Sequence, residues 1–182
     1  MTTTAEPIAT NDADTRARYY SAFYPMHLAL MAVGDNVFPV AWVTPVSKDP
    51  FRFIAAIDRS NYSLELLNRH REAILHYFDW SDRERIVRAG YSSGRRRDKK
   101  KKLGFVLEPA VALTTTGRVS GALAAFELRV IHEVDASDGD HAVFLFDVVH
   151  VHRGRRPAQE QPLLFLGYRD FATLGDRWRF RP

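Results

Sequence analysis

The chain of 182 residues contains no cysteine, which excludes disulfide bonds, thiolate metal sites and cysteine nucleophiles. It also lacks any apolar run near the roughly 18 residues that a membrane-spanning helix needs. The N-terminus has no charged segment followed by an apolar stretch, as a signal peptide would have. With 46% hydrophobic residues, the chain can bury one sizeable core. We therefore expect a single soluble, cytoplasmic domain with no membrane contact.

Several motifs that carry chemistry are missing as well. Neither GxGxxG nor GxxxxGK[ST] occurs, so the usual phosphate cradles are absent, and HExxH is absent too. His150 and His152 would share one face of a strand, but two imidazoles need further ligands to hold a metal. Asp138 and Asp140 flank a glycine, yet they offer fewer oxygens than calcium takes. We predict no metal site.

Positive charge is concentrated in one segment. The formal net charge is +4, but residues 95–102 (RRRDKKKK) hold seven basic residues and one acid, so the rest of the chain sums to −2. A nucleic-acid-binding surface usually spreads its charge and interleaves aromatic residues, and this run contains none. We interpret the run as a solvated loop and do not expect nucleic acid as a partner.

Short apolar runs typical of β-strands dominate most of the chain. The N-terminal segment, residues 1–16, has no periodicity, and we predict that it is a disordered tail. One such run alternates, with Phe126 and Leu128 facing one way and Glu127 and Arg129 the other. Turn residues at 34–36 and 135–140 predict hairpins between neighbouring runs. The predicted strands are 28–33, 37–43, 51–57, 125–133 and 141–151.

Helical patterns are few. Residues 61–70 begin with capping residues, and residues 81–90 open with Ser81 and Glu84 at the spacing of a capping box. Many strands, two short helices and no βαβ alternation favour an antiparallel barrel or sandwich. Taken alone, this local chemistry indicates only a soluble β domain.

Four stretches and a C-terminal segment, in this order, resemble the flavin reductase-like proteins, in particular their flavoredoxin-like branch. The resemblance runs from about Tyr20 to Gly175 and implies a mainly β fold. That fold is a six-stranded antiparallel Greek-key split β-barrel with a few short helices, over residues 17–176, followed by a C-terminal extension at 177–182. The matching stretches are NVFPVAWVTPVSKDP (36–50), IAAIDRSNYSLELL (54–67), SGRRRDK (93–99), the hairpin at 121–151 and PLLFLGYRDFATLG (162–175).

The same resemblance implies a function. It implies an NAD(P)H-dependent oxidoreductase that binds FMN, or FAD in its place, usually as a homodimer. Hydride would pass from the nicotinamide to the flavin, and electrons onward to an acceptor or a partner monooxygenase. Two alternatives stay open: an FMN-binding redox carrier or sensor without nicotinamide turnover, and a use of the barrel that involves no flavin.

The resemblance also implies site residues. The extended segment 41–47 would offer backbone groups and hydroxyls to the flavin, Arg59 and Ser63 would hold its phosphate, and His141 would lie near its exposed face as the catalytic residue. Trp42 can equally be a buried barrel residue and His141 a turn residue, while Thr44 and Ser47 suit turns beside proline. The predicted cofactor-binding residues are Ala41, Trp42, Val43, Thr44, Ser47, Asp58, Arg59, Ser60, Tyr62, Ser63, Ser93, Gly94 and Lys99.

The chain departs from the family pattern at three positions. Lys100 stands where an aromatic residue usually follows the loop lysine, Pro39 where the branch often carries Thr, and Phe171 where Tyr is common. The additional basic residues of 95–102 would attract NADPH phosphates or an acidic partner. These departures leave the expected fold intact and bear on the substrate.

Overall fold

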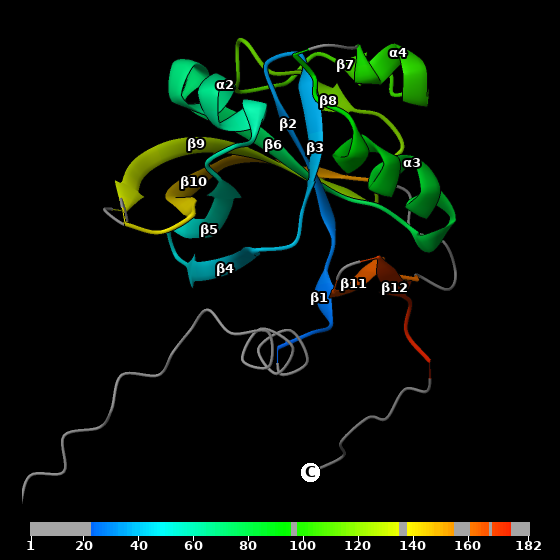
Figure 1. Ribbon diagram of the computed structural model, residues 1–182. Helices are drawn as coiled ribbons and strands as arrows, with labels where there is room; N and C mark the ends of the chain where they lie inside the picture. The colour runs from blue at the N-terminus through cyan, green and yellow to red at the C-terminus, as the bar shows by residue number, and fades with distance from the viewer. Residues whose placement is uncertain (1–22, 96–97, 135–137, 155–160, 168, 176–182) are drawn as a thin grey trace, which may run out of the picture.

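The computed structural model describes residues 23–95, 98–134, 138–154, 161–167 and 169–175 (Figure 1). The predicted tail at 1–16 and the extension at 177–182 lie outside the described residues. None of the described helices is long and apolar enough to cross a membrane.

Strands account for most of the regular structure. The helices are short: α2 (Tyr62–His70), α3 (Arg83–Arg88), α4 (Lys99–Leu103) and the 3₁₀ turns η1 (Trp80–Asp82) and η2 (Ala89–Tyr91). The strands are β1 (Met26–His27), β2 (Ala29–Val33), β3 (Asn36–Val40), β4 (Val43–Lys48), β5 (Phe51–Asp58), β6 (Glu72–Tyr77), β7 (Leu107–Glu108), β8 (Arg118–Val119), β9 (Ala124–Val134), β10 (His141–Arg153), β11 (Leu164–Gly167) and β12 (Asp170–Ala172).

The main sheet has seven strands in the order β3-β2-β6-β9-β10-β5-β4, with every neighbouring pair antiparallel. Figure 1 shows this sheet curled into a half-barrel, with α2 over one end and α3 beside β3. Strands β1, β11 and β12 form a separate small sheet, and β7 pairs with β8. The predicted fold class, an antiparallel split barrel with few helices, is confirmed.

Two features of the sheet differ from the sequence prediction. The run 37–43 is not one strand, because β3 ends at Val40 and β4 begins at Val43, where the Val43 amide donates to the Ala41 carbonyl over 2.9 Å. The prediction also missed β6, an almost wholly buried strand that follows α2 directly. Since β3 and β4 form opposite edges of the sheet, the chain at Ala41 and Trp42 crosses from one edge to the other.

Strand β2 is buried on both faces, which explains its uninterrupted apolar sequence ALMAV. Its residues Ala29, Met31 and Val33 join the core enclosed by the curled sheet and α2. Leu30 and Ala32 face a second core, shared with α3 and with Phe105 beyond α4. The sheet is therefore packed from both sides near β3, and this packing fixes the wall on which the site is built.

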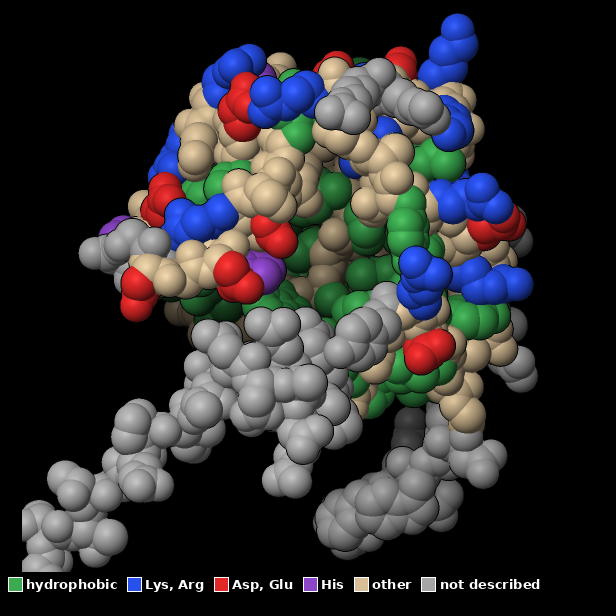
Figure 2. All heavy atoms as spheres, in the orientation of Figure 1, with side chains coloured by type: hydrophobic (Ala, Val, Ile, Leu, Met, Phe, Trp, Pro, Cys, Tyr) green, Lys and Arg blue, Asp and Glu red, His purple; other side chains and the backbone are tan. Residues whose placement is uncertain are grey.

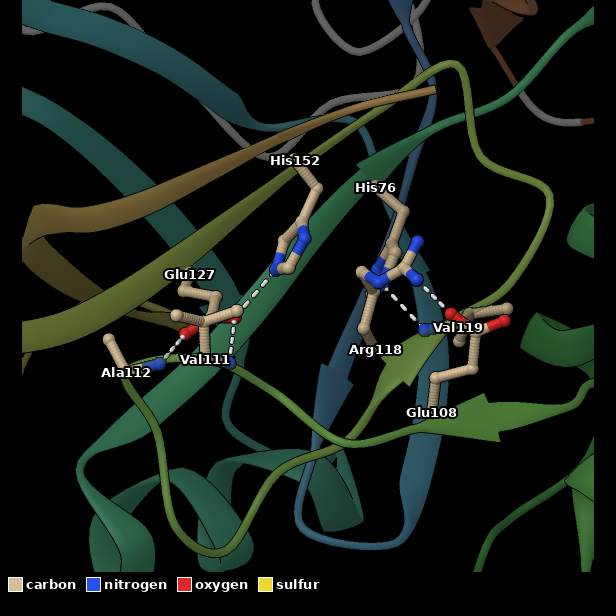
Figure 3. Close-up of polar contacts among 8 residues, drawn as sticks. All are labelled: His76, Glu108, Val111, Ala112, Arg118, Val119, Glu127 and His152. Atoms are coloured by element: carbon tan, nitrogen blue, oxygen red, sulfur yellow. Dashed lines mark hydrogen bonds and ion pairs between the residues drawn. The ribbon is translucent and has the colours of Figure 1, made fainter. Parts of the chain in front are cut away.

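A segment of chain at 109–117, here called the strap, covers the outer face of β6 and β9 (Figure 3). Glu127, on the face of the strand opposite to Phe126 and Leu128, is fully buried beneath it and accepts hydrogen bonds from the amides of Val111 (2.7 Å) and Ala112 (2.6 Å). Burial raises the pKa of Glu127, but these bonds and one from His152 outweigh that effect and hold the pKa below its ordinary value.

The start of α3 also corrects the prediction. Ser81 lies in η1, where its amide and hydroxyl both donate to Asp79, and α3 begins only at Arg83. Glu84 accepts from Arg88 one turn later instead of reaching back to Ser81. The predicted capping box is absent because Asp79, two residues earlier, caps the preceding turn.

His76 lies fully buried beneath the β7–β8 pair, beside Arg118 (Figure 3). Its Nε2 accepts from the Val119 amide over 2.8 Å, so its Nδ1 carries the proton and donates to the Leu30 carbonyl at 3.1 Å. Burial lowers the pKa of His76 to about 4. Between pH 6.5 and 4, therefore, the unfolded chain binds a proton that the folded chain does not.

We predict that the free energy of unfolding falls as the pH drops from 7 to 4, and that His76 contributes up to about 3 kcal/mol of this loss. Urea unfolding of the wild type and of His76→Gln across this range measures it, because Gln keeps one donor and one acceptor but does not titrate. The variant should lose less stability on acidification than the wild type. Equal losses would contradict the assignment.

Candidate functional site

A cleft in two connected compartments opens beside the crossing at Ala41 and Trp42. The first compartment has a volume of about 410 Å³ and the second about 480 Å³, and they share Phe38, Pro39, Asp58 and Asn61. Figure 2 shows this face as a hollow with hydrophobic side chains in its floor. Volumes of this size are typical of sites for small organic ligands and cofactors.

The first compartment has apolar and aromatic walls. It is lined by Tyr24, Val40, Ala41, Trp42, Ala56, Asp140, His141 and Phe165 besides the shared residues. The rings of Trp42 and His141 lie 4.5 Å apart between centroids, although they come from the crossing and from the start of β10. The Nδ1 atom of His141 lies 2.6 Å from Asp140 Oδ1, and this contact orients the imidazole.

The hairpin turn that carries His141 is tied to the end of β5. The amide of Arg59 donates to the Asp140 carbonyl at 3.0 Å, and its Nε donates to the Gly139 carbonyl at 2.9 Å. Next to it, Asp58 accepts from both the amide and the hydroxyl of Ser60. The Ser60 hydroxyl is the main reason that the pKa of Asp58 lies below its ordinary value, so this carboxylate is charged at the junction of the compartments.

The second compartment is polar and contains a buried cation. It is lined by Ser60, Tyr62, Ala89, Gly90, Tyr91, Ser92, Ser93, Gly94 and Lys99 in addition to the shared residues. The side chain of Lys99 is only 5% exposed, and its ammonium donates to the Val37 carbonyl at 3.0 Å. Burial lowers the pKa of Lys99 to about 8.

The basic run is not simply a solvated loop, which corrects the prediction for its described part. Residues 99–103 form α4, capped by Asp98, and Lys100 pairs with Asp35. Arg95 pairs with Glu65 and lies over the ring of Tyr62 at 4.9 Å. Arg96 and Arg97 lie outside the described residues. Arg95, Lys99 and Lys100 thus have specific partners around the second compartment.

Gly94 approaches Asn36 so closely that no side chain fits there. A Cβ atom at Gly94 would lie 2.1 Å from Asn36 Oδ1, and Asn36 is itself buried and donates to Ser63 Oγ at 2.8 Å. The loop after η2 is therefore packed directly on β3 and α2, and the first turn of α2 faces the same compartment through Tyr62.

A family model described as the flavin reductase like domain matches residues 21–175. The chain belongs to this family. A curated but uncharacterized protein of Archaeoglobus fulgidus is 28% identical over 134 residues, which is 72% of this chain and 74% of that protein.

Solved structures of an FMN-binding protein and of a flavin oxidoreductase have the same fold. An FMN-binding protein from Thermus thermophilus, crystallised with 1-cyclohex-2-enone, is 25% identical with a TM-score of 0.75, covering 89% of this chain and 93% of that one. The NADH:FAD oxidoreductase SgcE6 of Streptomyces globisporus is 21% identical with a TM-score of 0.74, covering 98% and 99%. The fold is thus that of FMN-binding proteins and flavin oxidoreductases.

The cleft brings together most of the residues that the family resemblance implied. The predicted residues that line it are Ala41, Trp42, Asp58, Ser60, Tyr62, Ser93, Gly94, Lys99 and His141. Val43, Thr44 and Ser47 belong to β4 and are not among the lining residues. Arg59 and Ser63 lie behind the lining, against the hairpin turn and Asn36, and their predicted contact with phosphate stays a prediction.

Sequence reasoning missed several lining residues. Tyr24 and Phe165 come from the two ends of the domain, and no local pattern links them. Gly90 to Ser92 were detectable, since with Ser93 and Gly94 they form one glycine- and serine-rich loop after α3. Among the described residues there is no group of three or more potential metal ligands. His152, one of the two histidines considered as a metal ligand, donates its Nε2 hydrogen to Glu127 at 2.6 Å.

Proposed function

We propose that this protein is an FMN-dependent oxidoreductase that takes a hydride from NADH or NADPH and passes electrons to an acceptor or a partner monooxygenase. One observation carries the proposal: a single cleft joins an aromatic-walled compartment to a polar one with a buried lysine. FMN has the same two-part character, with a flat ring system at one end and a phosphate at the other. FAD has the same ring system and is tested in parallel.

The second compartment supports phosphate binding by three kinds of group. The nine-residue helix α2, capped by Asn61, begins there at Tyr62, and the positive end of its helix dipole favours an anion. Ser93 and Gly94 bring backbone and hydroxyl groups close, and Lys99 supplies charge. Ser63 acts from behind by holding Asn36 against Gly94.

The first compartment suits the ring system. Trp42 and Phe165 offer apolar surface that excludes water, and the backbone of Ala41 and Trp42 runs along the wall. Asp58, at the junction, is a charged acceptor for the hydroxyl groups that connect ring and phosphate. Val43, Thr44 and Ser47 would then support the crossing from β4, and Arg59 would fix the turn beside it.

Bound FMN would supply the hydride acceptor, so no side chain needs to act as a nucleophile. His141 is placed to orient a second ligand, because its Nδ1 faces Asp140 and leaves Nε2 as its available polar atom in the compartment. Its contact with Trp42 keeps the imidazole against the wall. We propose that His141 binds the nicotinamide carboxamide and thereby sets the hydride-transfer geometry.

One observation favours a second candidate, a redox carrier or sensor that binds FMN without nicotinamide turnover. The residues that line the first compartment include two carboxylates, Asp58 and Asp140, and no Lys or Arg. Carboxylates in the lining of a site repel the pyrophosphate of a dinucleotide. The two candidates differ in one measurable property, which is reduction of the bound flavin by NAD(P)H.

We expect the purified protein to take up FMN and its visible absorbance to bleach without oxygen on addition of NADH or NADPH. His141→Phe keeps a ring against Trp42 but removes both polar atoms. This variant should bind FMN within about threefold of wild type and reduce it roughly 10- to 100-fold more slowly, because the carboxamide loses its hydrogen-bond partner at a cost of about 1.4–2.7 kcal/mol. Bound FMN that is reduced by neither NADH nor NADPH would establish the redox carrier or sensor instead. Failure to bind either FMN or FAD would refute both candidates.

Lys99 gives flavin binding a characteristic pH dependence. In the free protein the ammonium loses its proton near pH 8, and a bound phosphate dianion would raise this pKa. Proton uptake then accompanies binding, so FMN affinity should fall by about tenfold between pH 7 and 9. Fluorescence titration of FMN measures this. Lys99→Met should bind FMN at least about tenfold more weakly at pH 7 and lose the pH dependence, whereas Lys102→Met, at an exposed position of α4, should keep it.

We also propose that the protein is a homodimer. The outer face of β5 and β10 holds four partly exposed apolar residues, the opposite pairs Ile54 with Leu145 and Ala56 with Val143. Ala56 also lines the first compartment, so a second copy on this face would border the cleft. Sedimentation equilibrium should give a dimer mass for the wild type and for Val106→Lys, and a monomer mass for Leu145→Lys. A monomeric wild type would refute the proposal.

A further inference from the structure

A third cavity, here called the annex, branches from the cleft. It has a volume of about 260 Å³ and shares Pro39, Ala41 and Phe165 with the first compartment. Its remaining walls are Leu28, Val87, Gly90, Tyr91 and Phe171, and among them only Tyr91 carries a polar side-chain group. The rings of Phe165 and Phe171 lie 5.5 Å apart between centroids. The annex therefore has the shape and chemistry to take a small ring.

The annex continues into a larger cavity, here called the basin. The basin has a volume of about 670 Å³ and shares Val87 and Phe171 with the annex. Three arginines line it, from α3 and from the turn before β12, with two acidic residues and Trp80. These charged residues are Arg83, Arg88, Arg169, Glu84 and Asp170.

The arginines of the basin keep hydrogen-bond donors free for a ligand. Arg83 lies over Trp80 at 4.8 Å and donates only its Nη1 to the Trp80 carbonyl. Arg88 uses Nε and Nη2 on Glu84. Among the described residues, Arg169 has neither a hydrogen bond nor an ion pair. Since a guanidinium carries five N–H donors in a planar fork, such groups suit a carboxylate.

We propose that the annex and the basin together bind an aromatic carboxylate, with its ring in the annex and its carboxylate among the arginines of the basin. The proposal rests on the order of the two cavities, because the largely apolar annex lies between the cleft and the charged residues of the basin. A dinucleotide on this path would have to place its charged pyrophosphate in the apolar annex, at a large desolvation cost. An aromatic acid places each of its parts in a matching environment.

The site has a direct relation to the cleft. The inner end of the annex is formed by Pro39 and Ala41, which also line the first compartment. That the bound ring lies next to a flavin rests on the proposed function, whereas the binding of the acid rests on the annex and the basin alone. The two can therefore fail separately.

Calorimetric titration with benzoate and with neutral benzamide, on flavin-free and FMN-loaded protein, tests the proposal. Benzoate should bind at least about tenfold more tightly than benzamide, since only benzoate forms charge-assisted hydrogen bonds. Val87→Phe fills the annex at a partly exposed helix position and should weaken benzoate binding about tenfold. Arg169→Gln should weaken it about fivefold, and Arg69→Gln, on the exposed side of α2, should leave it unchanged.

Three results would overturn the proposal. They are equal affinities for benzoate and benzamide, no saturable benzoate binding, and unchanged benzoate affinity in Val87→Phe with the fold retained by circular dichroism. Displacement of benzoate by adenosine 2′-phosphate in an Arg169-dependent manner, unaffected by Val87→Phe, would assign the basin to a nucleotide and would also overturn it. Protein that binds benzoate but takes up no flavin would refute the proposed function and leave this site standing.

Discussion

The interruption of strand structure at Ala41 and Trp42, between β3 and β4, is the constraint on which the rest of the structure depends. It carries the chain from β3 at one edge of the sheet to β4 at the other, and the Trp42 carbonyl accepts the Ala56 amide at 2.9 Å on arrival. A closed barrel would continue pairing here. Because pairing stops, backbone groups and the Trp42 ring border an open cleft instead of a filled core.

Whether a charged side chain is buried or exposed depends here on the groups that pack against it and not on its neighbours in the sequence. Lys99, one of a run of four lysines, is buried against the Val37 carbonyl, while Lys100 reaches Asp35. Glu127 alternates with apolar residues as a surface residue would, yet the strap covers it. In both cases a distant segment that packs on the strand or helix decides whether a charged group is exposed.

The sequence predicted elements well where one local pattern determined them, as for the hairpin of β9 and β10 and for α2 behind its Asn61 cap. It failed where tertiary packing decided. Strand β6 is covered on both faces and carries Glu72 and His76, so its pattern resembled neither an alternating strand nor an apolar run. The lining residues that were predicted were reached through family resemblance, whereas Tyr24 and Phe165 were missed because they line the same compartment as Trp42 only in the completed fold.

The strap is held mainly through its backbone amides, with two side chains as further anchors: the Thr115 hydroxyl donates to Glu72, and Thr116 Oγ1 accepts the Gly34 amide at 2.9 Å. Glu72 and Glu127 accept backbone amides of residues 111–115, and amides are present whatever residues stand there, proline excepted. Substitutions at Val111, Ala112 and Thr114 therefore leave these amide bonds in place, whereas a change in the length of the strap would move the amides out of register with two carboxylates on fixed strands. Divergence in this part of the chain should thus be less constrained in composition at these three positions than in length.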